Sequence, residues 1–218
     1  MPRMIVSRFI LGPIGTNVYS LHRDGGHEAV VIDPAADGER IFEVLTSQGL
    51  RVSAILLTHA HFDHIGGVSK LKSLSGAKVY LSELETTLSR DPQANLSADY
   101  HTPVTISPDV YVRDGDVFTE ADITFRVIST PGHTEGSCCY YVDENGGQGT
   151  GDGKPMLFCG DTLFLESCGR TDMPTGSQSA LVRSIREKLF VLPDETRVYP
   201  GHMDFTTIGH EKKYNYFV

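Results

Sequence analysis

The sequence predicts one globular domain of the α/β class, and three features of its 218 residues support this prediction. Short apolar runs that are typical of strands alternate with segments of helical periodicity. Hydrophobic residues make up 39% of the chain and charged residues 22%, a balance typical of a folded protein rather than a disordered one. No internal repeat or linker-like stretch divides the chain, so we expect one domain spanning residues 1–218.

The first half of the chain is predicted to alternate strands with three helices. Apolar runs bounded by turn residues predict strands at Met4–Leu11, Asn17–His22, Ala29–Asp33, Ser53–Thr58 and Ala77–Leu81. Asp37 can cap a first helix that ends at Gly49, and a second is expected from Ile65 to Ser75. Ser82 and Glu85 have the spacing of a capping box and predict a third helix.

The second half is predicted to be richer in strands, after a polar, irregular stretch from Asp91 to Pro108. An antiparallel sheet with a hairpin turn at Asp114-Gly115 is expected from Val110–Val112, Val117–Phe118 and Ile123–Ile128. A further strand pair, Ser137–Val142 and Met156–Gly160, would flank a Gly-rich hairpin tip over Asp143–Pro155. The apolar spacing predicts a last long helix over Gln178–Leu189, capped by Ser177, and a final strand over Arg197–Tyr199.

Composition and charge exclude several classes of partner. A net charge of −9 without a Lys/Arg-rich stretch argues against nucleic-acid binding, because phosphate contacts depend on basic side chains. Arg3 and Arg8 bracket an apolar run too short for a signal peptide, and no stretch approaches the length of a membrane span. Neither zinc-finger spacing nor a disulfide framework is suggested by the four cysteines, Cys138, Cys139, Cys159 and Cys168. We therefore expect a cytoplasmic protein that does not bind membranes.

A dense cluster of metal-binding residue types follows the buried strand Ser53–Thr58, in the run Thr58-His59-Ala60-His61-Phe62-Asp63-His64. Imidazole and carboxylate groups suit zinc, iron or manganese. His59 and His61 alternate, so on an extended segment they point the same way. Asp63 and His64 come where the chain turns toward a helix, and they can face a second spot nearby. The run therefore predicts a metal centre that can serve two ions.

Three single residues elsewhere share one pattern, in which a strand end is followed by a ligand-type residue beside glycine. They are His133 in Pro131-Gly132-His133, Asp161 in Gly160-Asp161-Thr162 and His202 in Pro200-Gly201-His202. Taken singly, such a residue is more often structural. Strand ends on one edge of a sheet converge, however, and open α/β architectures place their sites there. We therefore expect these three residues to join the cluster.

In chain order, His59-x-His61-x-Asp63-His64, His133, Asp161 and His202 match the metal motifs of the metallo-β-lactamase fold superfamily. The sequence resembles this family from Asn17 to about Asn215. Val31-Ile32-Asp33-Pro34 resembles the family's first motif, in which Asp33 would support the metal loop rather than bind metal. The resemblance implies an αββα sandwich, with two mixed β-sheets packed face to face and helices on the outer faces.

The resemblance also implies roles for the motif residues. It implies a first metal ion held by His59, His61 and His133. It implies a second ion held by Asp63, His64 and His202. Asp161 would bridge the two ions, for which zinc is favoured and iron or manganese are alternatives. A hydroxide would form a second bridge and attack a substrate carbonyl, and Asp63 is a candidate proton shuttle.

Among the branches of the superfamily, the sequence is most similar to the glyoxalase II-like metallohydrolases, which are hydroxyacylglutathione hydrolases and their shorter bacterial relatives. The similarity lies in the segments 158–164, 169–172 and 206–212. Asp161 stands where typical zinc β-lactamases carry cysteine, so an antibiotic hydrolase is disfavoured. The resemblance implies a two-metal hydrolase whose substrate is a small thioester, a glutathione conjugate or a related ester.

Two departures keep the reaction open. The printed sequence ends 16 residues after His202, so we expect no counterpart of the C-terminal helical domain with which full glyoxalase II contacts glutathione. The segment Cys168-Gly169-Arg170-Thr171-Asp172 is also similar to the persulfide dioxygenases, which use one iron ion at the first site. Their last motif usually has alanine where this chain has Gly201. A mononuclear-iron persulfide dioxygenase is therefore the alternative.

Arg170 and Cys168 each have a substrate-binding and a structural interpretation. Arg170 could bind a substrate carboxylate through two hydrogen bonds, or it could pair with Asp172 or Asp33 and brace a loop, which we favour. Cys168 could contact a thiol or persulfide, but we favour an inert, partly buried thiol. Gly66-Gly67 is expected to permit close packing of the helix that follows the metal loop.

Overall fold

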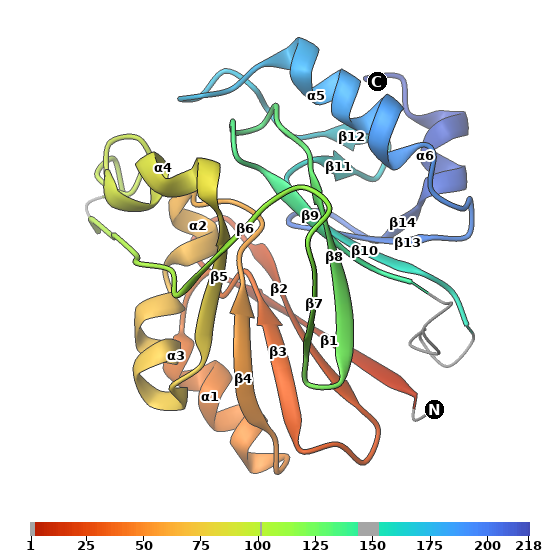
Figure 1. Cartoon of the computed structure of the whole chain (residues 1–218). Helices are drawn as coiled ribbons and strands as arrows, with labels where there is room; N and C mark the ends of the chain where they lie inside the picture. The colour runs from red at the N-terminus through yellow and green to blue at the C-terminus, as the bar shows by residue number, and fades with distance from the viewer. Residues whose placement is uncertain (1–2, 101, 144–152) are drawn as a thin grey trace.

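The computed structural model describes residues 3–100, 102–143 and 153–218, and two six-stranded β-sheets form its centre (Figure 1). The first sheet contains, in spatial order, β1 (Met4–Leu11), β2 (Thr16–Arg23), β3 (Glu28–Ile32), β4 (Arg51–Leu56), β5 (Lys78–Ser82) and β6 (Val110–Val112). The second contains β14 (Thr206–Thr207), β13 (Arg197–Pro200), β10 (Met156–Gly160), β9 (Cys138–Val142), β8 (Ile123–Ser129) and β7 (Val117–Glu120). Both sheets are mixed, because each combines parallel and antiparallel pairs.

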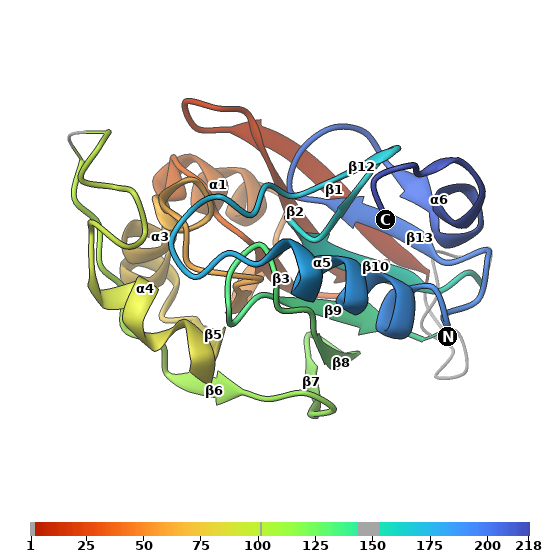
Figure 2. The same cartoon turned by 90° about the horizontal axis from the view of Figure 1, so that it is seen from above.

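Helices cover the outer faces of both sheets. The first sheet is covered by α1 (Gly38–Ser47) and α3 (Val68–Ser75). The second is covered by α5 (Gln178–Ser184), its continuation η3 (Ile185–Leu189) and α6 (Ile208–Tyr214). Seen from above, the two groups of helices lie on opposite sides of the strands (Figure 2). The predicted αββα sandwich is confirmed.

Three apolar layers hold the sandwich together. The central layer joins the inner faces of the two sheets and contains the large, fully buried rings of Phe125, Tyr140 and Phe158. Strand β4 is buried on both faces, because Leu56 points into this layer while Ile55 packs against the helices outside. Double burial explains the continuous apolar run in β4, since neither face of the strand meets water.

The last helix is confirmed as predicted, whereas the cap predicted for the first helix, α1, is wrong. Ser177 accepts a hydrogen bond from Ala180 N, and α5 with η3 buries its apolar face against the second sheet. Asp37 does precede α1, but its backbone is left-handed, with φ 51°, and its side chain makes no capping bond. Gly49, with φ 76°, follows the end of α1 as expected.

The hairpin predicted at Asp114-Gly115 is wrong, because the turn there carries the chain from one sheet to the other. Strand β6 pairs in parallel with β5, whereas β7 pairs antiparallel with β8 in the second sheet. The true two-residue hairpin loop is Ala121-Asp122, whose φ angles of 50° and 58° suit a type I′ turn. Alanine carries no turn signal of this kind, so the sequence pattern concealed the loop.

The second predicted helix is interrupted. A short α2 (Phe62–Ile65) comes first, and α3 begins only at Val68. A Cβ atom on Gly66 would lie 2.4 Å from the backbone oxygen of Ala35, so the chain passes too close to 34–36 for any side chain at this position. The expected role of Gly66-Gly67 in close packing is thus what the structure shows.

The predicted capping box is half right. Ser82 accepts a hydrogen bond from Leu84 N and begins the 3-10 turn η1 (Glu83–Glu85), which leads into α4 (Thr86–Arg90). Glu85 does not return to Ser82; its carboxylate is buried and binds two other loops.

Two further expectations, the hairpin of β9 and β10 and the absence of a membrane span, can be compared only with the residues that the structure describes. Strands β9 and β10 pair antiparallel as predicted, with Val142 opposite Met156, while most of the expected hairpin tip, residues 144–152, lies outside the described residues. Among the described residues, no helix combines the length and the apolar character that crossing a membrane would need.

Candidate metal centre

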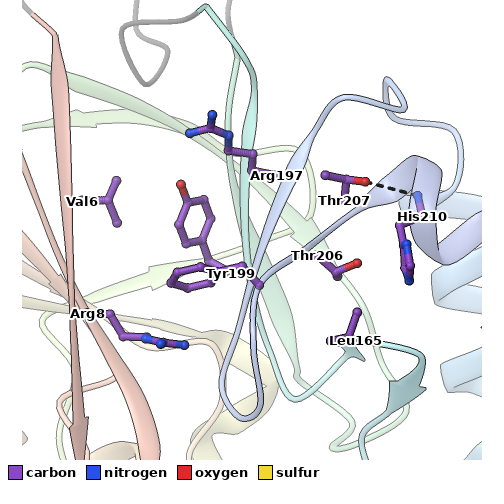
Figure 3. Close-up of a pocket in the computed structure, with 9 residues that line it drawn as sticks. Val6, Arg8, Leu165, Arg197, Tyr199, Thr206, Thr207 and His210 are labelled. Carbon is purple, nitrogen blue, oxygen red and sulfur yellow. Dashed lines mark hydrogen bonds between the residues drawn. The ribbon is translucent and has the colours of Figure 1, made fainter.

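Two cavities are candidates for the functional site, and they differ in the charged and metal-donor side chains that line them. One, of about 600 Å³, lies between β1 and the strands β13 and β14 (Figure 3). Its Arg8 pairs with Asp204 at 3.2 Å, and its His210 pairs with Glu166 at 2.9 Å. The other cavity, of about 790 Å³, contains members of all three groups of metal-donor side chains found in the described residues. The second cavity is therefore the candidate site.

Each ligand-type residue of the site follows the end of a strand or the first turn beyond it. The segment with His59 and His61 leaves β4, and Asp63 and His64 lie in α2. The remaining three residues follow β8, β10 and β13 respectively, namely His133, Asp161 and His202. The structure thus brings together all seven residues that the sequence indicated.

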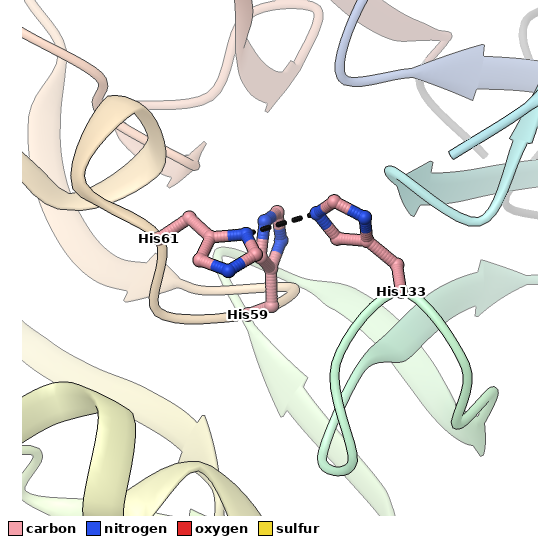
Figure 4. Close-up of side chains that lie close together, drawn as sticks. All are labelled: His59, His61 and His133. Carbon is pink, nitrogen blue, oxygen red and sulfur yellow. Dashed lines mark hydrogen bonds between the residues drawn. The ribbon is translucent and has the colours of Figure 1, made fainter. Parts of the chain in front are cut away.

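The first donor group consists of three imidazoles that converge from two loops (Figure 4). Donor atoms of His59, His61 and His133 all lie within 4.8 Å of one another. Nδ1 of His61 lies 2.9 Å from Nε2 of His133. All three side chains are buried, and His61 and His133 line the cavity. We name this set the imidazole trio.

The second donor group includes a carboxylate and consists of Asp63, His64 and His202. Nε2 of His202 lies 3.1 Å from Oδ2 of Asp63, and Nε2 of His64 lies 3.3 Å from the same oxygen. Thr16 donates a hydrogen bond of 3.0 Å to Asp63, which fixes this carboxylate from the β2 side. We name this set the mixed trio.

Asp161 lies between the two trios. Its Oδ1 is 3.3 Å from Nε2 of His64, and its Oδ2 is 3.6 Å from Nε2 of His133 and 3.5 Å from Nε2 of His202. Asp161 also forms a third possible donor group with His59 and His64. One carboxylate therefore faces residues of both trios.

The hydrogen-bond network leaves four buried polar atoms of the cluster without partners, as a metal site requires. Of the seven buried side-chain atoms without a partner in the described residues, four belong to this cluster: Nε2 of His59, Nε2 of His61, Nε2 of His64 and Oδ1 of Asp161. Buried polar atoms are normally paired, so an orphaned set in one place indicates a missing partner. Imidazole nitrogens and carboxylate oxygens are donors that divalent zinc or iron accepts, so the residues fit such ions.

Groups behind the histidines fix which ring nitrogen faces the cluster. His64 Nδ1 donates to Asp33 at 3.0 Å, and His133 Nδ1 donates to the backbone oxygen of Arg170 at 2.7 Å. The hydroxyl of Thr58 donates to Asp33 at 2.7 Å, which leaves its oxygen to accept from Nδ1 of His59 at 3.1 Å. The rings of His59, His64 and His133 thus present Nε2 to the cluster, with the other ring nitrogen bonded outside it, as is common for metal-bound histidines. Asp33 therefore bonds both to Thr58, beside the histidine loop, and to the ring of His64.

The pKa values of His59 and His61 in the imidazole trio shift in the opposite direction to that of His64 in the mixed trio. Burial lowers the pKa of His59, and burial together with the neighbouring His133 lowers the pKa of His61 to about 3. Burial also acts to lower the pKa of His64, but the carboxylates of Asp63, Asp161 and Asp33 outweigh it and raise that pKa. His59 and His61 of the imidazole trio are therefore kept neutral, whereas the mixed trio attracts positive charge.

The glycines beside the ligand residues are required by close approach. A Cβ atom on Gly201 would lie 2.3 Å from Oδ1 of Asp161 and 2.7 Å from the His64 ring. Gly160 has φ 48°, and a Cβ atom there would lie 2.2 Å from the hydroxyl of Thr58. The recurring glycine in the sequence pattern is thus explained, because side chains at these positions would occupy the metal cluster or its support.

The walls of the cavity are largely apolar. Phe62 and Tyr100 stack with ring centroids 4.0 Å apart, and the other apolar lining residues are Ile14, Leu96, Phe164, Met173 and Met203. Arg170 lines the cavity with its guanidinium paired through two bonds of 2.7 Å to Asp172 and not to Asp33. Cys168 also lines it, half-buried, and burial raises the pKa of its thiol.

Three residues that organise the site gave no usable signal in the sequence. Thr16, in β2, and Thr58, two residues beyond β4, bind Asp63 and Asp33 through their hydroxyl groups. Glu85 binds the loops that carry the imidazole trio. Hydroxyl residues in strands are common, and the spacing around Glu85 suggested a helix cap instead, so only the tertiary contacts identify these residues.

Comparison with curated proteins finds relatives along nearly the whole chain. An uncharacterized protein of Aquifex aeolicus is 38% identical over 98% of this chain and 97% of its own length. The probable metallo-hydrolase YqgX of Bacillus subtilis is 35% identical, covering 97% and 96%. The hydroxyacylglutathione hydrolase GloC of Haemophilus influenzae is 31% identical, covering 91% of each.

Solved structures with the same fold include proteins with different names. The B3 metallo-beta-lactamase BLEG-1 is 39% identical, with a TM-score of 0.88 over 98% of this chain and 99% of its own. TTHA1623 in a di-iron-bound form is 33% identical, with 0.82 over 97% and 100%. ETHE1 from Myxococcus xanthus is 30% identical, with 0.78 over 97% and 83%. The family model of the metallo-beta-lactamase superfamily matches residues 11–202, and the chain belongs to this superfamily.

Proposed function

We propose that the cluster holds two divalent metal ions, one in each trio. The imidazole trio would hold the first, the mixed trio the second, and Asp161 would contact both. The position of Asp161 between the trios is the single observation that carries this proposal, because two adjacent cations need a shared anion. The di-iron form of TTHA1623 supports a pair of ions. Zinc is favoured by the nitrogen-rich donor set, with iron and manganese as alternatives.

We infer that the enzyme hydrolyses a thioester or a related ester. Bound divalent ions supply hydroxide near neutral pH and stabilise negative charge on a carbonyl oxygen. The chain contributes a cavity whose apolar walls shield the reacting group and whose few polar side chains orient the substrate. The relative GloC, a hydroxyacylglutathione hydrolase, supports this substrate class.

Hydrolysis of a thioester would not require a strong general acid from the protein. A thiolate leaving group departs without a strong general acid, because its pKa is near 8.5. Asp63 stays ionised, since burial acts to raise its pKa but the neighbouring His64 and His202 lower it. Its role would therefore be to accept and pass on a proton from the attacking water rather than to donate one.

A second reaction, oxidation of a persulfide at a single iron ion, is favoured by two observations. ETHE1, a persulfide dioxygenase, shares the fold at 30% identity over 97% of this chain. The thiol of Cys168 lines the same cavity, where a sulfur-containing substrate could meet it. In this alternative the imidazole trio would hold the iron and the mixed trio would be empty.

We also place the enzyme in the cytoplasm. All four cysteines are described by the structure and free, and three are fully buried as small apolar groups. Thiols of this kind suit a reducing compartment.

One experiment separates these reactions. The purified protein is analysed for metal content and assayed with S-lactoylglutathione, with glutathione persulfide under oxygen measurement, and with a β-lactam, because BLEG-1 is so similar. We expect about two ions per chain and turnover of the thioester above that of the β-lactam. Oxygen consumption with persulfide, one iron ion per chain and no thioester turnover would overturn the proposal.

A further inference from the structure

Glu85 is a buried carboxylate that joins the two loops of the imidazole trio. Its side chain is fully buried at the end of η1. Oε2 accepts a hydrogen bond of 2.8 Å from Ala60 N. Oε1 accepts one of 2.6 Å from the hydroxyl of Thr134 and one of 2.9 Å from Gly136 N. One side chain therefore binds two segments that are far apart in sequence.

The bonded groups lie directly beside the trio. Ala60 stands between His59 and His61, and Thr134 follows His133. The loop of His59 and His61 and the loop of His133 come from different sheets, so their separation is not fixed by strand pairing. The carboxylate of Glu85 supplies a link of fixed length between them. The ligands of the mixed trio have no contact with Glu85 among the described hydrogen bonds.

Burial of this carboxylate opposes folding. None of the ion pairs in the described ranges includes Glu85. Burial raises the pKa of Glu85, against the hydrogen bonds from Thr134, Ala60 and Gly136 that favour the ionised form. A buried carboxylate without a cation costs stability, so its presence calls for a reason other than stability.

We propose that Glu85 is a positioning residue that holds the three imidazoles at the spacing a metal ion needs. This inference rests on the proposed function, in that the imidazole trio binds the first ion. A glutamine has nearly the same shape, but its amide has one oxygen and one NH2 group. Whichever way it turns, one loop meets a donor in place of an acceptor, and the link between the loops is lost.

The test measures zinc affinity in backgrounds that retain one trio each. His202→Ala leaves the imidazole trio complete, and His61→Ala leaves the mixed trio complete. Glu85→Gln is added to both, and zinc binding is measured by competition with a chromophoric chelator. Glu83→Gln is the matched control, because Glu83 lies in the same turn but pairs with Arg113 at the surface.

We expect Glu85→Gln to weaken zinc binding about 10- to 100-fold in the His202→Ala background, and by less than about threefold in the His61→Ala background. The urea midpoint of the metal-free protein should fall equally in both backgrounds, because a buried N–H group loses its acceptor in each, so stability alone does not produce a difference in zinc affinity. Equal losses of zinc affinity in both backgrounds would overturn the proposal and make Glu85 a general structural residue, as would unchanged affinity in both. If His202→Ala alone bound no zinc, the proposed metal sites would fail instead.

Discussion

The two trios of the metal centre lie side by side but differ in charge and in support. The imidazole trio has three nitrogen donors, and burial keeps the pKa values of His59 and His61 low. Its loops are held by Glu85 and by the backbone oxygen of Arg170. The mixed trio lies among carboxylates that raise the pKa of His64, and Asp33 holds it from behind.

This difference shows how one fold can place two unlike sets of donor side chains next to each other. In the imidazole trio burial lowers the pKa values of His59 and His61, so these two donors can bind a metal ion without losing a proton. In the mixed trio the carboxylates raise the pKa of His64, which keeps a proton that a metal ion must displace. The trios should therefore respond differently to mutation and to pH.

Removal of Asp161 should have the largest effect, because this carboxylate faces both trios. We expect Asp161→Ala to lose at least one metal ion and to lower kcat/KM about a thousandfold or more, as the loss of several kcal/mol of charge stabilisation implies. Metal analysis and thioester kinetics check this. Asp194→Ala, at a surface pair with Lys212, is the control. Two retained ions with near-normal turnover would show that the trios do not share Asp161.

Removal of the Asp33 carboxylate should affect the mixed trio more than the imidazole trio. Asp33→Asn weakens the hold on Nδ1 of His64, while His59 keeps its contact with Thr58. We expect the second zinc equivalent to bind about 10- to 100-fold more weakly and the first to change less. Stepwise zinc titration of metal-free protein measures both. A larger loss of zinc affinity at the first equivalent would show that Asp33 supports the imidazole trio more than the mixed trio.

Acidification should empty the mixed trio first. The pKa of His64 is raised, so below it a proton occupies the ring, and zinc affinity should fall about tenfold per pH unit for each proton displaced. The pKa values of His59 and His61 are lowered, that of His61 to about 3, so these two donors stay unprotonated between pH 7 and pH 5 and the first equivalent should lose less affinity. Zinc titrations at pH 5, 6 and 7 test this, and a parallel decline of both equivalents would contradict it.

Removal of the Arg170 side chain should have the smallest effect. His133 donates to the backbone oxygen of Arg170, whereas the guanidinium forms an exposed pair with Asp172. We expect Arg170→Ala to change zinc affinity at the imidazole trio by less than about fivefold, because exposed ion pairs contribute little. A rise in KM without a change in zinc affinity would show that Arg170 binds substrate.

The sequence predicted the donors of both trios and a supporting role for Asp33, but not the contacts of Glu85 beside the imidazole trio. Motif spacing placed His59, His61, Asp63 and His64 after a buried strand, and the glycine pattern predicted the other three. Glu85 was mistaken for part of a helix cap, because Ser82 and Glu85 have the spacing of a capping box and only the fold brings Ala60 and Thr134 to that carboxylate.

The same limit applies to the fold. Apolar runs predicted most strands, such as β1 and β4, because local burial sets their pattern. The pattern could not show that β6 and β7 belong to different sheets, since a turn at Asp114-Gly115 is compatible with both a hairpin and a crossing between sheets. Sheet membership depends on contacts distant in sequence, which no local signal encodes.

The central claim, two metal sites that share Asp161, is tested most directly by counting zinc equivalents bound by the metal-free wild-type chain. At pH 7, calorimetric titration should show two equivalents per chain. The His202→Ala variant should show one. Saturation of the wild type at a single equivalent, unchanged in His202→Ala, would contradict the account and leave the imidazole trio as a lone site.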